Sequence, residues 1–139
     1  MSDSWRDWTP GETAAWIRQP TASDDKYSRG VVGVVTGSAE YPGAAVLGVE
    51  AAARAGAGMI RYLGDHEAAR FVLQRRPEAV TADGRVQSWL VGSGMDAAAR
   101  TGELAGQLEA RLGQGVPVVL DAGALDLVGS AAGPALLTP

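Results

Sequence analysis

Short apolar runs bounded by glycine alternate along this chain with longer segments of helical character. Residues 30–36 and 117–121 are the clearest runs, and each is continuous and rich in valine. Continuous apolarity is typical of strands buried on both faces of a parallel sheet, whereas one-sided strands alternate with polar residues. We predict strands at 30–36, 59–63, 78–82, 86–91, 117–121 and 135–138.

The segments between these runs carry helix signals. Thr9, Pro10 and Glu12 form the pattern of a capping box with proline in the first turn, and Asp65 is placed to cap another helix. We predict helices at 9–18, 43–55, 66–74, 96–112 and 122–128. Strands that alternate with helices build a parallel sheet with helices on both faces. The predicted fold is therefore α/β, with a mostly parallel central sheet in a Rossmann-like three-layer αβα arrangement.

The amino-acid composition narrows the class of protein. There are 12 Lys and Arg against 16 Asp and Glu, a formal net charge of −4, so we expect no nucleic-acid partner. The chain has no cysteine, which excludes disulfides and Cys-type zinc sites, and no His or carboxylate cluster has metal-ligand spacing. No apolar run reaches the ~20 residues of a membrane helix. We expect a cytoplasmic protein with no membrane partner and no metal ligands of its own.

Residues 37–45 join the first predicted strand to a helix. Amides at the start of that helix face the carboxyl edge of the sheet, where open parallel sheets bind ligands, although a turn without a ligand explains the same residues. The helix is apolar on nearly every side and is interrupted only by Glu50 and Arg54, an i,i+4 ion pair. Packing within the fold explains this surface, and a subunit interface in a homo-oligomer is the alternative.

Residues 92–97 (GSGMDA) match the G-x-G-x-x-A pattern of dinucleotide-binding Rossmann loops. Asp121 ends the next clear strand, where such an enzyme places an acid for the ribose. The same aspartate also suits a helix N-cap. This motif leaves a Rossmann-type NAD-binding oxidoreductase open as one hypothesis.

Several segments, taken together and in order, resemble one family. They are 26–38 (KYSRGVVGVVTGS), 41–45 (YPGAA), 55–58 (AGAG), 91–94 (VGSG), 117–125 (PVVLDAGAL) and 136–139 (LLTP). They are similar to the opening, the V-G-P-G loop, the P-V-V-L-D-A-D-A-L segment and the I-L-T-P end of the NAD(P)H-hydrate dehydratases. The resemblance covers about residues 25–139, so we assign 1–24 to a polar N-terminal segment with a short helix.

The resemblance implies a ribokinase-like fold and a nucleotide-repair reaction. The family removes water from the S forms of NADHX and NADPHX, the hydrates of NADH and NADPH, with ADP or ATP as co-substrate and Mg²⁺ as the expected ion. The resemblance places Gly43, Ala44 and Gly94 against the hydrated dinucleotide. It places Asp121 on the floor of the site or in its supporting loop.

The sequence departs from the family pattern in three places. The family's Lys-Gly-x-x-Gly is replaced at 26–30, Ser93 stands in place of a proline, and the family's later half has no counterpart. That half carries the nucleotide-binding residues and the catalytic aspartate. We therefore expect residues 25–139 to form the N-terminal half of a dehydratase domain, truncated at Pro139 and without its catalytic base. A noncatalytic fragment that needs the missing half as a second polypeptide is the other hypothesis.

Overall fold

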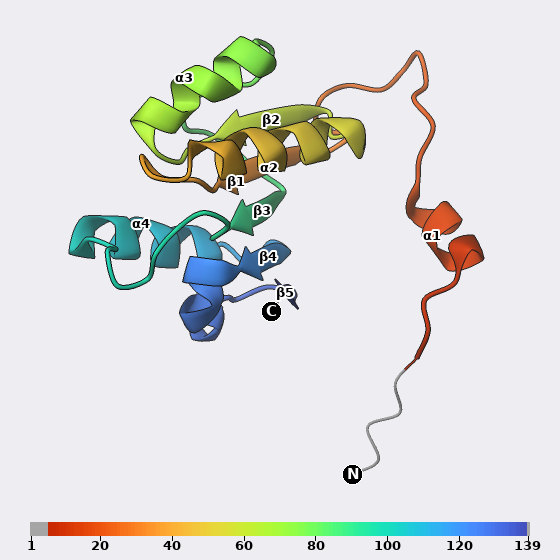
Figure 1. Ribbon diagram of the computed structural model, residues 1–139. Coiled ribbons are helices and arrows are strands. Elements are labelled where there is room, and N and C mark those ends of the chain that lie inside the picture. The colour runs from red at the N-terminus through yellow and green to blue at the C-terminus, as the bar shows by residue number, and fades with distance from the viewer. Residues whose placement is uncertain (1–5, 139) are drawn as a thin grey trace.

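The computed structural model describes residues 6–138 and shows one parallel β-sheet with helices on both faces (Figure 1). Its strands are β1 (Val31–Val35), β2 (Met59–Tyr62), β3 (Ser88–Val91), β4 (Val118–Asp121) and β5 (Ala135–Thr138). They lie in the order β2-β1-β3-β4-β5, and each pair of neighbours is parallel. The predicted α/β fold is confirmed. Residues 1–5 of the predicted N-terminal segment and Pro139 of the LLTP motif lie outside the described residues.

The helices divide between the two faces of the sheet. On one face, α2 (Pro42–Arg54) and α3 (His66–Arg75) pack on β1 and β2. On the other face, α4 (Gly102–Leu112) and the 3-10 helix η1 (Ala122–Ser130) pack on β3, β4 and β5. This division follows from right-handed crossovers, because the chain steps one way across the sheet from β1 to β2 and the other way from β3 to β5.

Strand β1 lies inside the sheet and is buried on both sides, as its continuous apolar sequence predicts. Val31 and Val35 belong to the apolar cluster that contains α4 and η1, whereas Val34 belongs to the cluster that contains α2 and α3. All three side chains are essentially inaccessible to solvent. Burying each valine contributes about 1.5–3 kcal/mol relative to an exposed side chain.

Trp89 of β3 is the largest fully buried side chain among the described residues, and it lies across Gly33 of β1. A β-carbon at position 33 would occupy the space of the indole ring. The indole Nε1 donates to Gln114 Oε1 at 3.0 Å, and the Arg111 guanidinium lies 5.3 Å from the ring centroid. Glycine within β1 therefore makes room for an aromatic ring from the neighbouring strand.

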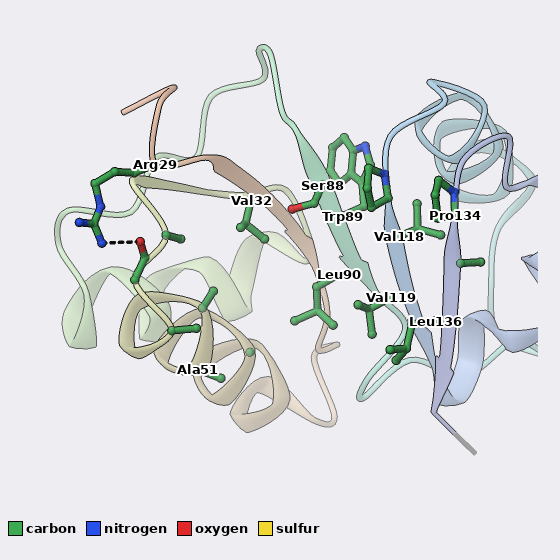
Figure 2. Close-up of a pocket in the computed structure, with 17 residues that line it drawn as sticks. Arg29, Val32, Ala51, Ser88, Trp89, Leu90, Val118, Val119, Pro134 and Leu136 are labelled. Carbon is green, nitrogen blue, oxygen red and sulfur yellow. Dashed lines mark hydrogen bonds between the residues drawn. The ribbon is translucent and has the colours of Figure 1, made fainter. Parts of the chain in front are cut away.

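The sheet face that carries α2 is only partly covered. No described helix lies over β3, β4 and β5 on that side, and the side chains of Leu90, Val119 and Leu136 face an open groove beside α2 (Figure 2). Leu136 is 58% exposed. Parallel strands are normally covered on both faces, so this groove is unusual for the fold.

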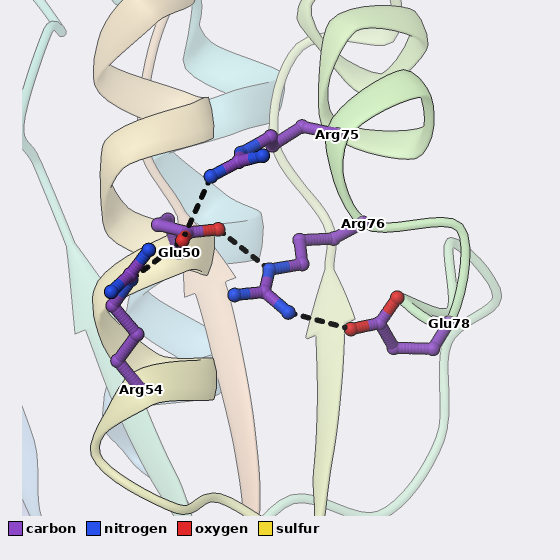
Figure 3. Close-up of polar contacts among 5 residues, drawn as sticks. All are labelled: Glu50, Arg54, Arg75, Arg76 and Glu78. Carbon is purple, nitrogen blue, oxygen red and sulfur yellow. Dashed lines mark hydrogen bonds and ion pairs between the residues drawn. The ribbon is translucent and has the colours of Figure 1, made fainter.

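An ion-pair network joins α2 to the end of α3 (Figure 3). The predicted Glu50–Arg54 pair forms at 2.6 Å, and Glu50 also accepts from Arg75 at 3.2 Å and from Arg76 at 2.6 Å. Arg76 also reaches Glu78 at 3.3 Å. The hydrogen bonds from Arg76 and Arg54 lower the pKa of Glu50 to about 2. One carboxylate thus holds the two helices of this face together.

Three predicted elements differ from the structure. Residues 78–82 form only an isolated parallel bridge between Val80 and Arg61, since Pro77 and Glu78 form a turn directly before it. The helix predicted from Asp96 begins at Gly102. The segment predicted as a helix at 122–128 is the 3-10 helix η1, which runs on to Ser130.

The late start of α4 has a local cause. The Asp96 side chain accepts from the Ala98 amide at 2.9 Å, which closes a tight turn in place of helical hydrogen bonding. Thr101 then caps α4 by accepting from the Leu104 amide at 3.2 Å.

The N-terminal helix α1 (Pro10–Trp16) lies apart from the sheet in Figure 1. The predicted capping box is present: Thr9 N donates to Glu12 Oε2 at 2.9 Å, and Glu12 N donates to Thr9 Oγ1 at 3.3 Å. Across residues 6–138, none of the helices combines the length and apolarity that crossing a membrane requires.

Candidate functional site

Three loops meet at the carboxyl edge of the sheet, where open parallel sheets bind ligands. Two are the loops after β1 (residues 36–41) and β3 (92–95), and the third is the first turn of η1 (122–124), which directly follows β4. The amide of Gly37 donates to the carbonyl of Ser93 at 2.6 Å, which joins the first loop to the second. Gly37 and Gly94 both have positive φ, at 79° and 70°, so glycine suits both positions. Together the loops form a continuous backbone surface.

Gly94 and Ala44, two of the predicted substrate-contact residues, are direct neighbours. A β-carbon at position 94 would lie 2.5 Å from the Ala44 β-carbon, 3.1 Å from Gly37 Cα and 3.2 Å from Tyr41 O. The absence of a side chain at 94 therefore lets the β3 loop pack against the first turn of α2. Packing inside the fold is thus enough to explain why position 94 is glycine. A contact between Gly94 and a dinucleotide stays a prediction.

The first turn of α2 is open towards this edge. Tyr41 occupies the N-cap position without a side-chain hydrogen bond to the helix, and Pro42 follows it at the start of the helix. Ser38 Oγ instead accepts from the Tyr41 amide at 3.1 Å, which shapes the loop before the helix. Gly43, the next predicted contact residue, is exposed. Helix N-termini without a side-chain cap favour oxygen atoms of a ligand.

Asp121 at the end of β4 is held by two hydroxyl groups. Ser93 Oγ donates to Asp121 Oδ2 at 2.6 Å, and Thr138 Oγ1 donates to Asp121 Oδ1 at 2.6 Å. These two hydrogen bonds, the one from Ser93 first, lower the pKa of Asp121 below its ordinary value. A carboxylate with both oxygens engaged and a lowered pKa is a weak base, so its geometry suits a positioning role.

Asp121 occupies the N-cap position of η1, as the helix-capping alternative predicts, but its side chain makes no capping hydrogen bond. It instead links the β3 loop, through Ser93, to the end of β5, through Thr138. The serine that replaces the family's proline thereby gains a structural role that the sequence did not reveal.

The Rossmann alternative also fails on geometry. That fingerprint needs a helix to begin at the glycine loop so that its N-terminus faces the pyrophosphate. Here α4 begins at Gly102, after a turn formed by residues 96–101. Asp121, the proposed partner of the ribose, is occupied by Ser93 and Thr138. The glycine loop therefore lacks both features of a Rossmann site.

A cavity of about 230 Å³ lies beside the predicted residues, on the α4 side of the same edge. Its polar lining includes Ser38, Asp65, Asp96 and Arg100. The Arg100 side chain is only 7% exposed, and its guanidinium donates at 2.7 Å to both Gly123 O and Asp126 Oδ1. Arg100 thus ties the segment before α4 to η1. Nothing in the sequence around Arg100 distinguished it from a surface arginine.

The described residues do not fit a resident metal ion. Within 6–138, no group of three or more His, Cys, Asp or Glu side chains lies together as metal ligands would. Asp121, at the end of β4, already accepts from two hydroxyl donors.

Comparison with known sequences identifies relatives of this chain. The sequence model of the NAD(P)H-hydrate dehydratase family matches residues 32–139. The chain is 45% identical over 142 residues to the bifunctional NAD(P)H-hydrate repair enzyme Nnr of Mycobacterium leprae, and 44% identical over 115 residues to that of Corynebacterium glutamicum. These alignments cover 92% and 79% of this chain but only 28% and 19% of the two relatives.

Solved structures with the same fold include members of the same family. The ADP/ATP-dependent NAD(P)H-hydrate dehydratase from Bacillus subtilis, co-crystallized with ATP/Mg²⁺, matches with a TM-score of 0.79 at 25% identity, over 95% of this chain and 52% of that one. A ribokinase-like superfamily protein from Enterococcus faecalis, 22% identical, shares the fold with a TM-score of 0.70. The chain thus spans about half the length of these solved structures. Together with the loops at the sheet edge, the match over residues 32–139 shows that this chain belongs to the NAD(P)H-hydrate dehydratase family.

Proposed function

We propose that this chain forms the substrate-facing part of a dehydratase that converts the S forms of NADHX and NADPHX back to NADH and NADPH, with ADP or ATP as co-substrate. The observation that carries the proposal is the contact between Gly94 and Ala44 at the carboxyl edge of the sheet. Two motifs that are 50 residues apart, and that resemble the family, form one surface there. The repair enzymes among its relatives support the substrate class.

The chemistry explains why a nucleotide is needed. Hydroxide is a poor leaving group, so the ring hydroxyl is first phosphorylated, with ATP leaving as ADP or ADP as AMP. Phosphate then departs with the C–O bond electrons, and loss of a ring proton restores the double bond. Such a reaction needs a base for the hydroxyl and hydrogen-bond donors for the transferring phosphoryl group.

The chain's own residues supply binding and orientation in this proposal. The first turn of α2 presents the amide of Gly43, while the Ala44 amide donates to Tyr41 O at 3.2 Å, and the β3 loop at Gly94 brings backbone to the dinucleotide. Asp121 keeps that loop in place through Ser93. With its lowered pKa, Asp121 is not the base, which we assign to the later half of the family's domain.

The test follows the return of NADH absorbance from purified NADHX with ADP or ATP. We would compare this chain with a fusion in which it is followed by the segment of the Mycobacterium leprae relative that comes after the matched part. We expect the chain alone to bind NADHX without turnover and the fusion to restore NADH. Absence of turnover in a folded fusion, together with absence of NADHX binding to the chain by calorimetry, would reject the proposal.

A further inference from the structure

Two buried hydroxyl groups, those of Thr36 and Tyr62, lie at the start of the loop that follows β1. Thr36 is the only fully buried polar residue, aromatic residues apart, in the part of the chain that the structure describes. Tyr62 of β2 is 1% exposed. Its hydroxyl donates to Thr36 O at 2.8 Å, and Thr36 Oγ1 donates to Ala44 O at 3.3 Å. These two hydrogen bonds connect β2, the end of β1 and the first turn of α2.

Two glycines leave the space that these hydroxyl groups occupy. A β-carbon at Gly64 would lie 2.6 Å from Tyr62 Oη and 2.9 Å from Thr36 O. A β-carbon at Gly48 would lie 3.1 Å from Thr36 Oγ1. Neither glycine has a positive φ, so the backbone conformation itself would accept another residue. Gly48 lies inside α2, where glycine is less favourable than alanine. Room for the two hydroxyl groups therefore accounts for glycine at both positions.

The hydrogen bond from Tyr62 fixes one particular peptide unit. The carbonyl of Thr36 and the amide of Gly37 belong to the same planar group. Tyr62 Oη holds the carbonyl end at 2.8 Å, and the amide end donates to Ser93 O at 2.6 Å. The second of these contacts joins the β1 loop to the β3 loop. A rotation of this peptide unit would therefore break both contacts at once.

Glycine at position 37 makes such a rotation possible. A peptide unit rotates by a change of ψ in the residue before it and of φ in the residue after it, and glycine accepts φ of either sign. Gly37 has a φ of 79° here. Without the Tyr62 hydroxyl, the buried Thr36 carbonyl loses this donor, which is costly. Burial raises the pKa of Tyr62 above its ordinary value, so the hydroxyl keeps its proton and remains a donor.

We propose that Tyr62 is a positioning residue for the surface at the carboxyl edge of the sheet. Through the peptide unit between Thr36 and Gly37, it keeps the β1 loop against the β3 loop and the first turn of α2. It acts through the backbone, because a side chain that is 1% exposed does not reach a ligand. Its effect on ligand affinity rests on the proposed function, whereas its effect on the loop does not.

Four substitutions test this role. Tyr62→Phe removes the hydroxyl and keeps the ring in its apolar cluster, and Gly64→Ala disturbs the same hydrogen bond by placing a methyl group 2.6 Å from Tyr62 Oη. Tyr27→Phe removes a hydroxyl from an exposed tyrosine outside the loops. Val118→Ala lowers stability from the apolar cluster on the other face of the sheet. Amide hydrogen exchange is measured residue by residue by nuclear magnetic resonance, and NADHX affinity by calorimetry.

We expect exchange of the Gly37 amide to accelerate about tenfold more than that of the α4 amides in Tyr62→Phe and in Gly64→Ala. NADHX should bind to Tyr62→Phe about threefold to tenfold more weakly. Tyr27→Phe should change neither measurement. Val118→Ala should not accelerate Gly37 more than α4, and the folded protein should keep its NADHX affinity.

Equal acceleration of the Gly37 and α4 amides in folded Tyr62→Phe would overturn the positioning role, because the hydroxyl would then contribute only to overall stability. Selective acceleration of Gly37 with unchanged NADHX affinity would overturn it as well. If the wild-type chain binds no NADHX, that result counts against the proposed function. The exchange of the Gly37 amide alone then decides whether Tyr62 positions the loop.

Discussion

The contact between Gly94 and Ala44 predicts a measurable steric cost for any side chain at position 94. Alanine there must adopt a φ of 70°, which costs about 1–2 kcal/mol for a residue with a β-carbon. Its methyl group would also lie 2.5 Å from the Ala44 methyl, well inside the roughly 3.5–4.0 Å of normal carbon contact. Relieving an overlap of this kind typically costs about 1–3 kcal/mol. We therefore expect Gly94→Ala to lower the free energy of unfolding by about 2–5 kcal/mol.

Gly115 provides the control that separates backbone strain from overlap. Its φ is 76°, close to that of Gly94, but a β-carbon there meets nothing within 4 Å. Gly115→Ala should therefore cost only the backbone part, about 1–2 kcal/mol. Ala44→Gly should partly rescue Gly94→Ala, because the nearest remaining atom, Gly37 Cα, would be 3.1 Å away.

The assay is urea unfolding of each variant, followed by far-ultraviolet circular dichroism, with NADHX affinity measured by calorimetry. The double-mutant cycle should give a favourable coupling of about 1–2 kcal/mol between Gly94→Ala and Ala44→Gly. We expect NADHX binding to weaken with Gly94→Ala and to be unchanged with Gly115→Ala. Equal destabilisation by the two glycine substitutions, with no coupling to position 44, would refute the close approach of the two loops.

Three further predictions concern the pairs that hold the sheet and its loops. The pKa of Glu50 is lowered from 4.5 to about 2, so its contribution to stability is complete above pH 4.5 and is lost as pH falls through 2. Glu50→Gln should lower stability at pH 7 and flatten acid unfolding in this range. Glu67→Gln, which breaks a longer and more exposed ion pair, should change the stability at pH 7 little. The lowered pKa of Asp121 likewise gives stability that is present above pH 3.8 and is lost as pH falls through its folded pKa. In Asp121→Asn that part of the pH dependence of unfolding should disappear. An unchanged dependence of stability on acid pH would contradict the two hydroxyl contacts. Gly33→Ala should force the indole of Trp89 out of place and lower the free energy of unfolding by at least about 2 kcal/mol. The displaced ring should lose its near-ultraviolet circular dichroism signal, and an unaltered signal would show that the ring lies elsewhere.

Local signals in the sequence predicted the elements wherever a short-range interaction decides the structure. The continuous valines of β1 indicated burial on both faces, and the capping box at Thr9 and the cap at Asp65 are both present. The signals failed where another local interaction competed. Asp96 closes a turn with its own backbone neighbours, so the helix predicted from that residue begins only at Gly102.

The candidate site divides in the same way. The resemblance to the family pointed to Gly43, Ala44, Gly94 and Asp121, and the rule that parallel strands end at one edge predicted that their segments lie together. It did not reveal that Ser93 and Thr138 hold Asp121, or that Arg100 ties the segment before α4 to η1. These contacts join residues 17 to 28 positions apart, so no local pattern encodes them.

The sequence by itself determined the order of strands and helices, the class of fold and the resemblance to one family, because each depends on periodicity, caps and short motifs. Only the tertiary structure decided which loops touch, why position 94 has no room for a side chain, and which sheet face stays bare. Those properties arise from strand order and crossover handedness, which bring distant residues together. The groove beside α2 shows this most clearly: its alanines look like ordinary helix packing in the sequence, and only the tertiary structure shows that they line an open apolar groove.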